Sequence, residues 1–302
     1  MIKLILWLIL VCAVVAPFTF LKPTTQHLLS NELNQDDTAR NQAEQDLVKR
    51  NQLSGQAKPK VVEVDEKPLH NVDLPDFASI SDIPTKKQQF FDFMTPAIME
   101  QNQQILTTRA ELEYWLEQVS FEVGLTEQEE RKLQSLAKRY RLRGNNSSLQ
   151  QINELLVRVD IIPLPLVLVQ AANESAWGTS RFAKIGLNFF GIWCYEPKCG
   201  MVPNGRNKGA KHEVAAFDSI EEAVAGYFIN INTHNAYRVF RTIRSQLRVN
   251  NEPFAPEILA TGLLPYSERG ADYVLDITDM LRHNQSFFAN EGEDYYTREI
   301  HN

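Results

Sequence analysis

Residues 174–187 read ESAWGTSRFAKIGL and continue directly into Asn188-Phe189-Phe190-Gly191-Ile192. This stretch places a carboxylic acid, Glu174, at the end of an apolar run and follows it with glycines, which tight turns favour. A carboxyl group at a helix end and beside a turn can act as a general acid at the edge of a groove. Glu174 is therefore the first candidate catalytic residue.

The residues before Glu174 have the spacing of a buried helix. Pro163 suits a first helical turn, and residues of one buried face follow it at three- and four-residue intervals: Leu164, Val167, Leu168, Ala171, Ala172 and Ser175. At roughly 100° per residue, Glu174 lies about 80° from the middle of this face, at the rim of the core. Partial burial raises a carboxyl pKa, and the Trp177 indole would strengthen the effect. We expect Glu174 to donate a proton near neutral pH; the alternative is a capping or salt-bridging residue.

The joint motifs resemble the glucosaminidase family of peptidoglycan hydrolases. The resemblance rests on Glu174-Ser175-Ala176-Trp177-Gly178, Ser180-Arg181-Phe182-Ala183-Lys184 and Asn188-Phe189-Phe190-Gly191-Ile192, and extends from about residue 82 to the last helix. It implies an α+β fold that is mostly α: a lysozyme-like helical domain with a small β lobe over the active-site groove. It also implies that Glu174 is the general acid of an endo-acting β-N-acetylglucosaminidase that cleaves β-1,4 bonds in glycan strands.

The flanking sequence agrees with a mostly helical domain. Residues 193–217 lose the helical period and are rich in Gly, Pro and Asn, as an extended lobe would be. Ser219 and Glu222 have the spacing of a capping box, and a second apolar helical face follows them. Further helices are expected over 83–119, 126–143, 237–249, 256–262 and 271–284.

Glycoside hydrolysis usually needs a second carboxylate, as nucleophile or as base for a water. The expected β lobe holds Glu196 and Glu213, and we favour Glu213 because 211–217 alternates like a strand. The N-acetyl group of the substrate offers another route, in which it assists its own hydrolysis. The identity of the second catalytic group therefore stays open.

Aromatic and amide side chains near the motifs are the expected substrate contacts. By its position before the last helix, Tyr266 matches the Tyr of the family's Tyr-Ala-Thr-Asp loop, which lines the cleavage site, although the three residues after it depart from that motif. Aromatic rings suit the C–H faces of sugars, and an amide suits an N-acetyl group. The predicted substrate-binding residues are Trp177, Asn188, Phe190, Trp193 and Tyr195.

The cysteines bear on compartment and on metal binding. Cys194 and Cys199 could close a small disulfide loop in an oxidising compartment. A zinc site would need two more soft ligands, and only His212 is close in sequence. We therefore expect no metal and no other cofactor.

The first residues predict export. Residues 4–21 carry no charge and follow Lys3; as a helix they would extend about 27 Å, close to bilayer thickness. Residues 1–21 are thus either a signal peptide or an uncleaved membrane anchor. Both predict a periplasmic or exported protein, and the anchor would tether it to the inner membrane through 4–21.

Composition divides the rest of the chain. Residues 22–81 are polar and poor in aromatics, which predicts a flexible low-complexity linker. A helical N-terminal subdomain (82–146), the catalytic domain (147–290) and a tail (291–302) would follow.

The charge of the chain bears on its binding partners. A net charge of −7 and a pI near 5.5 give no reason to expect nucleic acid as a partner. The expected partners are the glycan strands of peptidoglycan and the inner membrane. Two other functions stay open: a lytic transglycosylase of the same fold, and a non-catalytic cell-wall-binding scaffold.

Overall fold

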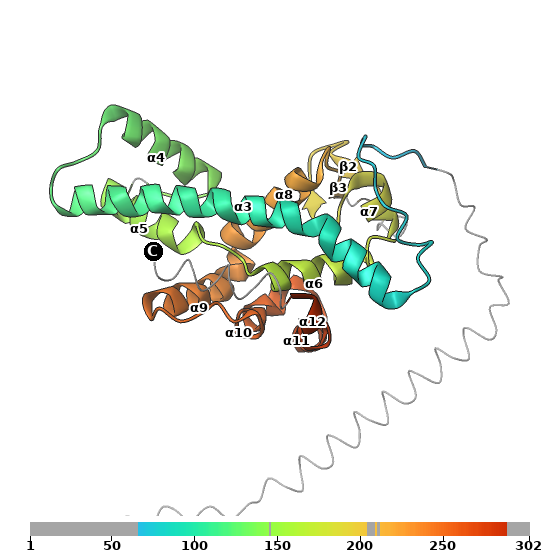
Figure 1. Cartoon of the computed structure of the whole chain (residues 1–302). Coiled ribbons are helices and arrows are strands. Elements are labelled where there is room, and N and C mark those ends of the chain that lie inside the picture. Colours follow the sequence, from blue (N-terminus) through green and yellow to red (C-terminus); the bar gives the residue numbers. More distant parts are fainter. Residues whose placement is uncertain (1–65, 145, 204–208, 210–211, 289–302) are drawn as a thin grey trace, which may run out of the picture. The chain divides into compact units, whose positions relative to one another are not determined.

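The computed structural model describes residues 66–144, 146–203, 209 and 212–288 of the 302-residue chain. The described residues belong to one compact unit that begins at Glu66. They form a mostly helical, lysozyme-like α+β fold with one small antiparallel sheet (Figure 1), and this confirms the predicted fold class.

The helices are α3 (Ile83–Ser120), α4 (Glu127–Arg139), α5 (Ser148–Arg158), α6 (Leu164–Ser175), α7 (Arg181–Gly186), α8 (Ile220–Thr233), α9 (Arg238–Val249), α10 (Pro256–Ala260), α11 (Ala271–His283) and α12 (Gln285–Phe288). Two short 3-10 helices, η1 (Asn235–Tyr237) and η2 (Thr261–Tyr266), flank α9 and α10. The strands are β1 (Trp193–Cys194), β2 (Gly200–Met201) and β3 (Glu213–Ala215), and β3 is the central one.

The helix starts follow from local capping. Thr126 and Glu129 form both hydrogen bonds of a capping box at the start of α4. At the start of α8, Ser219 Oγ accepts from the Glu222 amide at 3.1 Å. These bonds satisfy amides that a helix start otherwise leaves unpaired, which explains why the sequence located both starts correctly.

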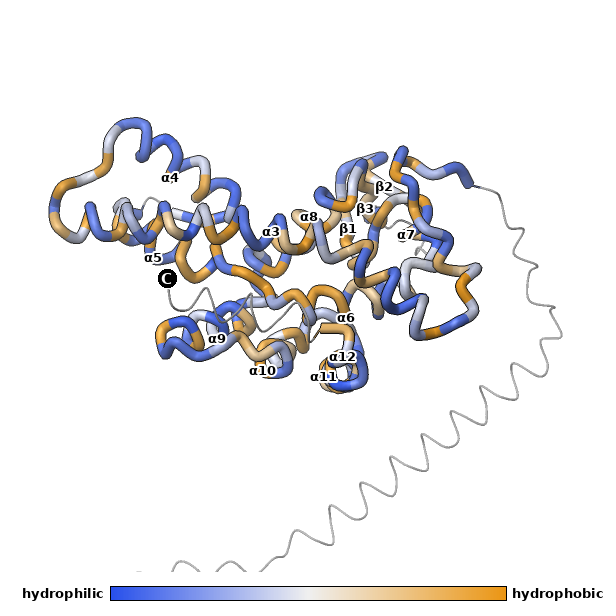
Figure 2. Tube along the Cα trace, viewed as in Figure 1, coloured by the Kyte–Doolittle hydropathy of each residue, from blue (hydrophilic) through white to orange (hydrophobic). Residues whose placement is uncertain are grey.

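Helix α6 lies in the middle of the core. Every residue from Leu164 to Ala172 is buried, and the hydropathy trace shows orange, apolar segments in this helix (Figure 2). Helix α3 packs against α5, α6 and α8, so that Phe90, Met94 and Ile98 belong to the same core as α6. The division predicted between 82–146 and 147–290 therefore does not separate two cores.

Residues 66–81, which composition assigned to the linker, pack on α7 and on the turn after α6. The Leu69 amide donates to the Ile185 carbonyl at 2.8 Å, and Arg181 pairs with Glu66 at 2.7 Å. Phe77 is 1% exposed, and a Cβ added to Gly178 would lie 2.5 Å from its ring. The absence of a side chain at Gly178 thus makes room for Phe77.

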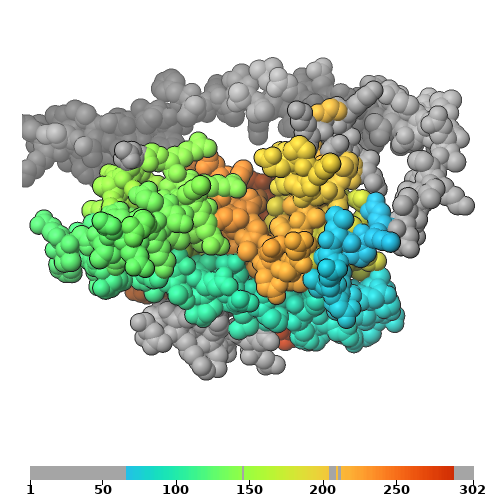
Figure 3. Space-filling model, turned by 90° about the horizontal axis from the view of Figure 1, so that it is seen from above, coloured from blue at the N-terminus to red at the C-terminus, as the bar shows by residue number. Residues whose placement is uncertain are grey.

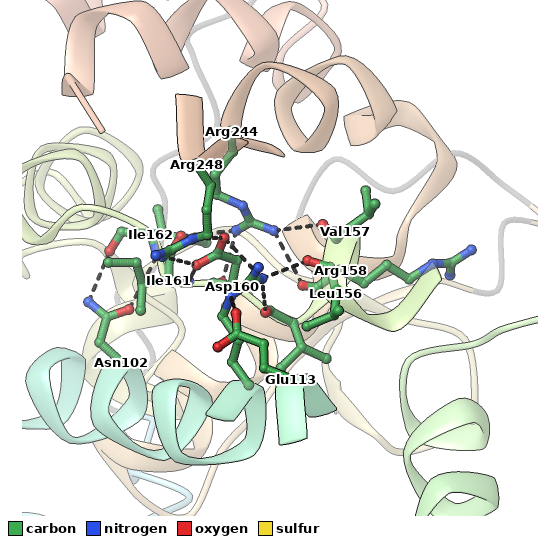
Figure 4. Close-up of polar contacts among 12 residues, drawn as sticks. Asn102, Glu113, Leu156, Val157, Arg158, Asp160, Ile161, Ile162, Arg244 and Arg248 are labelled. Carbon is green, nitrogen blue, oxygen red and sulfur yellow. Dashed lines mark hydrogen bonds and ion pairs between the residues drawn. The ribbon is translucent and has the colours of Figure 1, made fainter. Parts of the chain in front are cut away.

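The segment between α5 and α6 is held by a buried ionic cluster (Figure 4). The Asp160 carboxylate accepts hydrogen bonds from Arg248, at 2.5 and 2.8 Å, and from Arg109 at 3.3 Å. The fully buried Arg244 donates to the carbonyls of Asp160 and Ile161, at 2.9 and 3.0 Å. Because α6 begins directly after this segment, the cluster fixes where the helix that carries Glu174 starts.

Within the described ranges, none of the helices combines the length and the apolar character needed to cross a bilayer. The predicted signal peptide or anchor (1–21), most of the predicted linker and the tail (291–302) lie outside those ranges.

Candidate active site

Glu174 is the penultimate residue of α6, and the chain turns sharply after it. Ala176, Trp177 and Gly178 all adopt positive φ angles, of 50°, 58° and 75°. The buried Ser175 hydroxyl donates to the Ala171 carbonyl at 2.6 Å and accepts from the Gly178 amide at 2.8 Å. In Glu-Ser-x-x-Gly, the serine and the glycine therefore build the turn that ends the helix beside the acid.

The second motif forms a turn around Asn188. The Asn188 amide group donates to the carbonyls of Ile192 and Ala215, at 2.9 and 2.8 Å, and its oxygen accepts from the amides of Phe190 and Ile192. The turn requires φ +65° at Gly191, where an added Cβ would lie 3.7 Å from Glu174 Oε2. Asn188 thus joins the motif to β3 and brings the Gly191 backbone beside the carboxyl.

The Glu174 carboxyl is half-buried. Burial raises its pKa, whereas hydrogen bonds from Tyr273 and from Asn173, the latter at 3.2 Å, lower it; the net effect is a raised pKa. Among the described residues, no lysine or arginine forms an ion pair with it. The group therefore has the electrostatic environment of a proton donor and not that of a salt-bridge partner.

A chain of hydrogen bonds leads from the core to this carboxyl. The Tyr227 hydroxyl donates to Gln170 Oε1 at 2.5 Å, and Gln170 Nε2 donates to the Tyr273 hydroxyl at 2.9 Å. Because the Tyr273 oxygen already accepts from Gln170, its own proton is directed to Glu174. Gln170, Tyr227 and Tyr273 are at most 2% exposed. This buried hydrogen-bonded chain therefore supports the carboxyl from the core side.

Tyr266 lies next to this chain. Its ring stacks on Tyr273 at a centroid distance of 5.3 Å, and its hydroxyl donates to the Phe190 carbonyl at 2.7 Å. The Glu174 charge is one of the causes that raise the pKa of the Tyr266 hydroxyl, after burial and the neighbouring Tyr273 and Tyr227. The structure thus brings Tyr266 to the site, as a partner of the Gly191 turn.

The predicted sugar contacts fall into two groups. Phe190 is 1% exposed and stacks on Tyr227. The side chain of Asn188 is hydrogen-bonded to backbone groups. Both residues therefore support the structure of the site from the protein interior. Trp193 and Tyr195, 49% and 77% exposed, are free to contact a ligand on the strand side. Trp177 packs partly on Phe91 and lines a cavity next to Asn173.

Glu213 lies in β3 beside the disulfide between Cys194 and Cys199. Its two carboxylate oxygens accept from the amides of Lys198 and Gly200, at 3.3 and 3.0 Å. These contacts favour a role in fixing the loop between β1 and β2. The two sulfurs and this carboxylate lie within 4.8 Å of one another, but the cysteines are paired and offer no thiolate to a metal.

Four residues of the site were not predicted as functional: Gln170, Asn173, Tyr227 and Tyr273. Gln170 is a polar residue within the buried, otherwise apolar stretch 164–172 of α6, and this is a signal in the sequence that a buried partner exists. Tyr273 falls within the helix predicted over 271–284, and nothing in its local pattern distinguishes it from a packing residue.

The space-filling view shows a hollow between the green part of the chain on one side and the orange and yellow parts, which include β2 and β3, on the other (Figure 3). This arrangement agrees with the small β lobe that was predicted to lie across from the helical part.

Comparison with known proteins identifies the class. Residues 149–286 match the family model Glucosaminidase, described as mannosyl-glycoprotein endo-beta-N-acetylglucosaminidase. This range contains Glu174 and every residue of the site described above. No solved structure gives a significant match to the chain.

The chain is 34% identical over 218 residues to Protein bax of Escherichia coli (strain K12), an alignment that covers 72% of this chain and 76% of that protein. The protein therefore belongs to the glucosaminidase family and is Bax-like. The family assignment indicates a glycosidase that acts on peptidoglycan.

Proposed function

We propose that the protein is an endo-β-N-acetylglucosaminidase that hydrolyses the β-1,4 bond after N-acetylglucosamine in peptidoglycan strands, with Glu174 as the general acid. The observation that carries the proposal is the half-buried Glu174 carboxyl, which has a raised pKa and no cationic partner among the described residues. The backbone of Gly191 lies beside this carboxyl and carries no side chain, which supports access of a sugar chain to the proton.

The chemistry begins with protonated Glu174. As the bond between C1 and the glycosidic oxygen breaks, the carboxyl gives its proton to that oxygen and becomes a carboxylate. Tyr273 and Asn173 then donate to the newly charged group. These donors stabilise the charge that develops in the transition state, and they are already in place before the reaction starts.

For the second step we favour the N-acetyl group of the substrate over a protein carboxylate. Glu196 and Glu213 are the carboxylates between residues 193 and 217, and both Glu213 oxygens are bonded to loop amides. The acetamido oxygen would bond to C1 as the glycosidic bond breaks. Water would then open this ring and return a proton to Glu174, so the product would keep the configuration of the substrate.

Replacing Tyr273 by Phe tests the hydrogen bond that supports the carboxyl. The bond favours the charged form, so its loss raises the pKa of Glu174 further. Because the acid must be protonated to work, activity is lost as pH rises through that pKa, and the alkaline limb of the kcat/KM profile should move to higher pH. We expect kcat to fall about fivefold, as the loss of roughly 1 kcal/mol implies.

Tyr114→Phe is the matched control, because Tyr114 is 58% exposed on α3. It should leave the profile in place. An unchanged alkaline limb in Tyr273→Phe, with the fold intact, would show that the hydroxyl does not support Glu174.

The proposed compartment is the periplasm or another oxidising, exported location, with residues 4–21 as a signal peptide or a tether to the inner membrane. The disulfide between Cys194 and Cys199 supports this proposal because such bonds persist in oxidising compartments.

The experiment is digestion of purified sacculi by the full chain, followed by mass analysis of the released strands. Reducing N-acetylglucosamine ends are the expected product. Anhydro-muramic ends would instead identify a lytic transglycosylase, and an absence of any new ends would identify a non-catalytic wall-binding protein.

A further inference from the structure

A cavity of about 420 Å³ opens beside the catalytic carboxyl. It is lined by Lys87, Asn173, Trp177, Asp276, Asp279, Met280, His283 and Asn284. Asn173 is the link to the active site, because its side chain lines the cavity and also donates to Glu174 Oε1 at 3.2 Å. A molecule in the cavity therefore lies one side chain away from the proton donor.

The cavity extends along the same helix face that holds the acid. Asp276 and Met280 on α11, and Asn284 at its C-terminal cap, follow Tyr273 by three, seven and eleven residues, which places them on the same side of the helix as Tyr273. From Asp276 to Asn284 this face rises about 12 Å, at about 1.5 Å per residue. That length equals three to four residues of an extended peptide, at about 3.3–3.6 Å each.

The walls of the cavity carry charges of both signs. Lys87 Nζ donates to Asn284 Oδ1 at 2.8 Å and lies 5.3 Å from the centre of the Trp177 ring. No carboxylate among the described residues pairs with Lys87. Asp276 and Asp279 bond to arginines, but their side chains remain 45% and 62% exposed. The cavity thus presents a cation and two anions that can bind a ligand.

These charges indicate which part of the substrate the cavity fits. The N-acetylated sugar rings of a glycan strand are uncharged, and aromatic and amide side chains bind them. The stem peptides attached to alternate sugars carry carboxylates and, at a diamino acid, a free amino group. We propose that this cavity binds the stem peptide next to the bond that is cleaved. Lys87 pairs with a stem carboxylate, and Asp276 and Asp279 pair with the amino group. This inference rests on the proposed function.

The test compares two soluble substrates: uncrosslinked peptidoglycan strands that carry stem peptides, and the same strands after an amidase has removed the stems. Reducing ends released by the full chain give kcat/KM for each. We expect stem-bearing strands to be cleaved about tenfold more efficiently. The double variant Lys87→Gln/Asp279→Asn should reduce this ratio to near one by slowing cleavage of the stem-bearing strands.

Lys86→Gln and Asp272→Asn are matched controls, since neither residue lines the cavity, and they should keep the preference. Equal rates of the wild type on both substrates would overturn the inference, and so would an equal loss on both substrates in the double variant. The proposed function would survive either result. Cleavage of neither substrate by folded wild type would overturn both.

A binding measurement without turnover separates the stem-peptide inference from the proposed hydrolase function. The free tetrapeptide stem should shift the Trp177 indole N–H signal of the Glu174→Gln protein in NMR spectra, and Lys87→Gln in that background should weaken the binding about tenfold. A signal that the peptide does not move at millimolar concentration would contradict the proposal.

Discussion

Replacing Glu174 by Gln is expected to lower the rate of sacculus digestion about a thousandfold, because a positioned general acid contributes roughly two to four orders of magnitude. Gln has nearly the same shape and can still accept from Tyr273 and Asn173, so the site should keep its geometry. It has no proton to give to the glycosidic oxygen. Initial rates of reducing-end release, measured over the pH range of wild-type activity, provide the comparison.

The stability of Glu174→Gln gives an independent check. A raised pKa means that the folded state disfavours the ionised carboxyl, a penalty that is absent below the unfolded pKa and complete above the folded one. At pH 7 the variant should therefore have a melting temperature equal to or above that of the wild type. Full activity in a folded variant would show that Glu174 is not the acid.

Replacing Asp160 by Ala should lower the free energy of unfolding by about 3–5 kcal/mol, the usual loss when one member of a buried ion pair is removed. Burial alone would raise the pKa of Asp160, but Arg109, Arg244 and Arg248 outweigh it and lower the pKa. Without the carboxylate, the fully buried Arg244 is left among carbonyl groups with no anion (Figure 4). Urea unfolding at pH 7, followed by circular dichroism, measures the difference.

The stabilisation contributed by the Asp160 carboxylate depends on pH in a defined direction. A lowered pKa gives stabilisation that is complete above the unfolded value of about 3.9 and is lost as pH falls through the folded value. The difference in the free energy of unfolding between the wild type and Asp160→Ala should thus become smaller below about pH 4. Glu127→Ala is the control, because its ion pair with Arg131 is 93% and 71% exposed and should contribute at most about 1 kcal/mol. A loss that small at Asp160 would refute the structural role of the cluster.

Local patterns in the sequence were enough to predict the helices around the site. The helix that carries Glu174 followed from its apolar spacing, and the start of α8 followed from the capping spacing of Ser219 and Glu222, because these signals depend on residues within a few positions of one another. The half-buried position of Glu174 followed from the same spacing.

Roles that depend on distant segments could not be predicted in this way. An asparagine amide suits an N-acetyl group as well as it suits a carbonyl, and only the fold shows that Asn188 bonds to Ala215. Tyr273 has the helical spacing of a core residue, and its bond to Glu174 depends on how α6 meets α11. The strand that carries Glu213 was predicted correctly, but its loop partners, Lys198 and Gly200, lie 15 and 13 residues earlier in the chain.

The central claim is that Glu174 is protonated at the pH where the protein works. The most direct measurement is a ¹³C NMR titration of the side-chain carboxyls, with the Glu174 signal assigned by its absence in Glu174→Gln. We expect the Glu174 carboxyl to have a pKa above the ordinary glutamate value, and this pKa should coincide with the alkaline limb of kcat/KM. An ordinary or lowered pKa, or a limb that does not follow this titration, would contradict it.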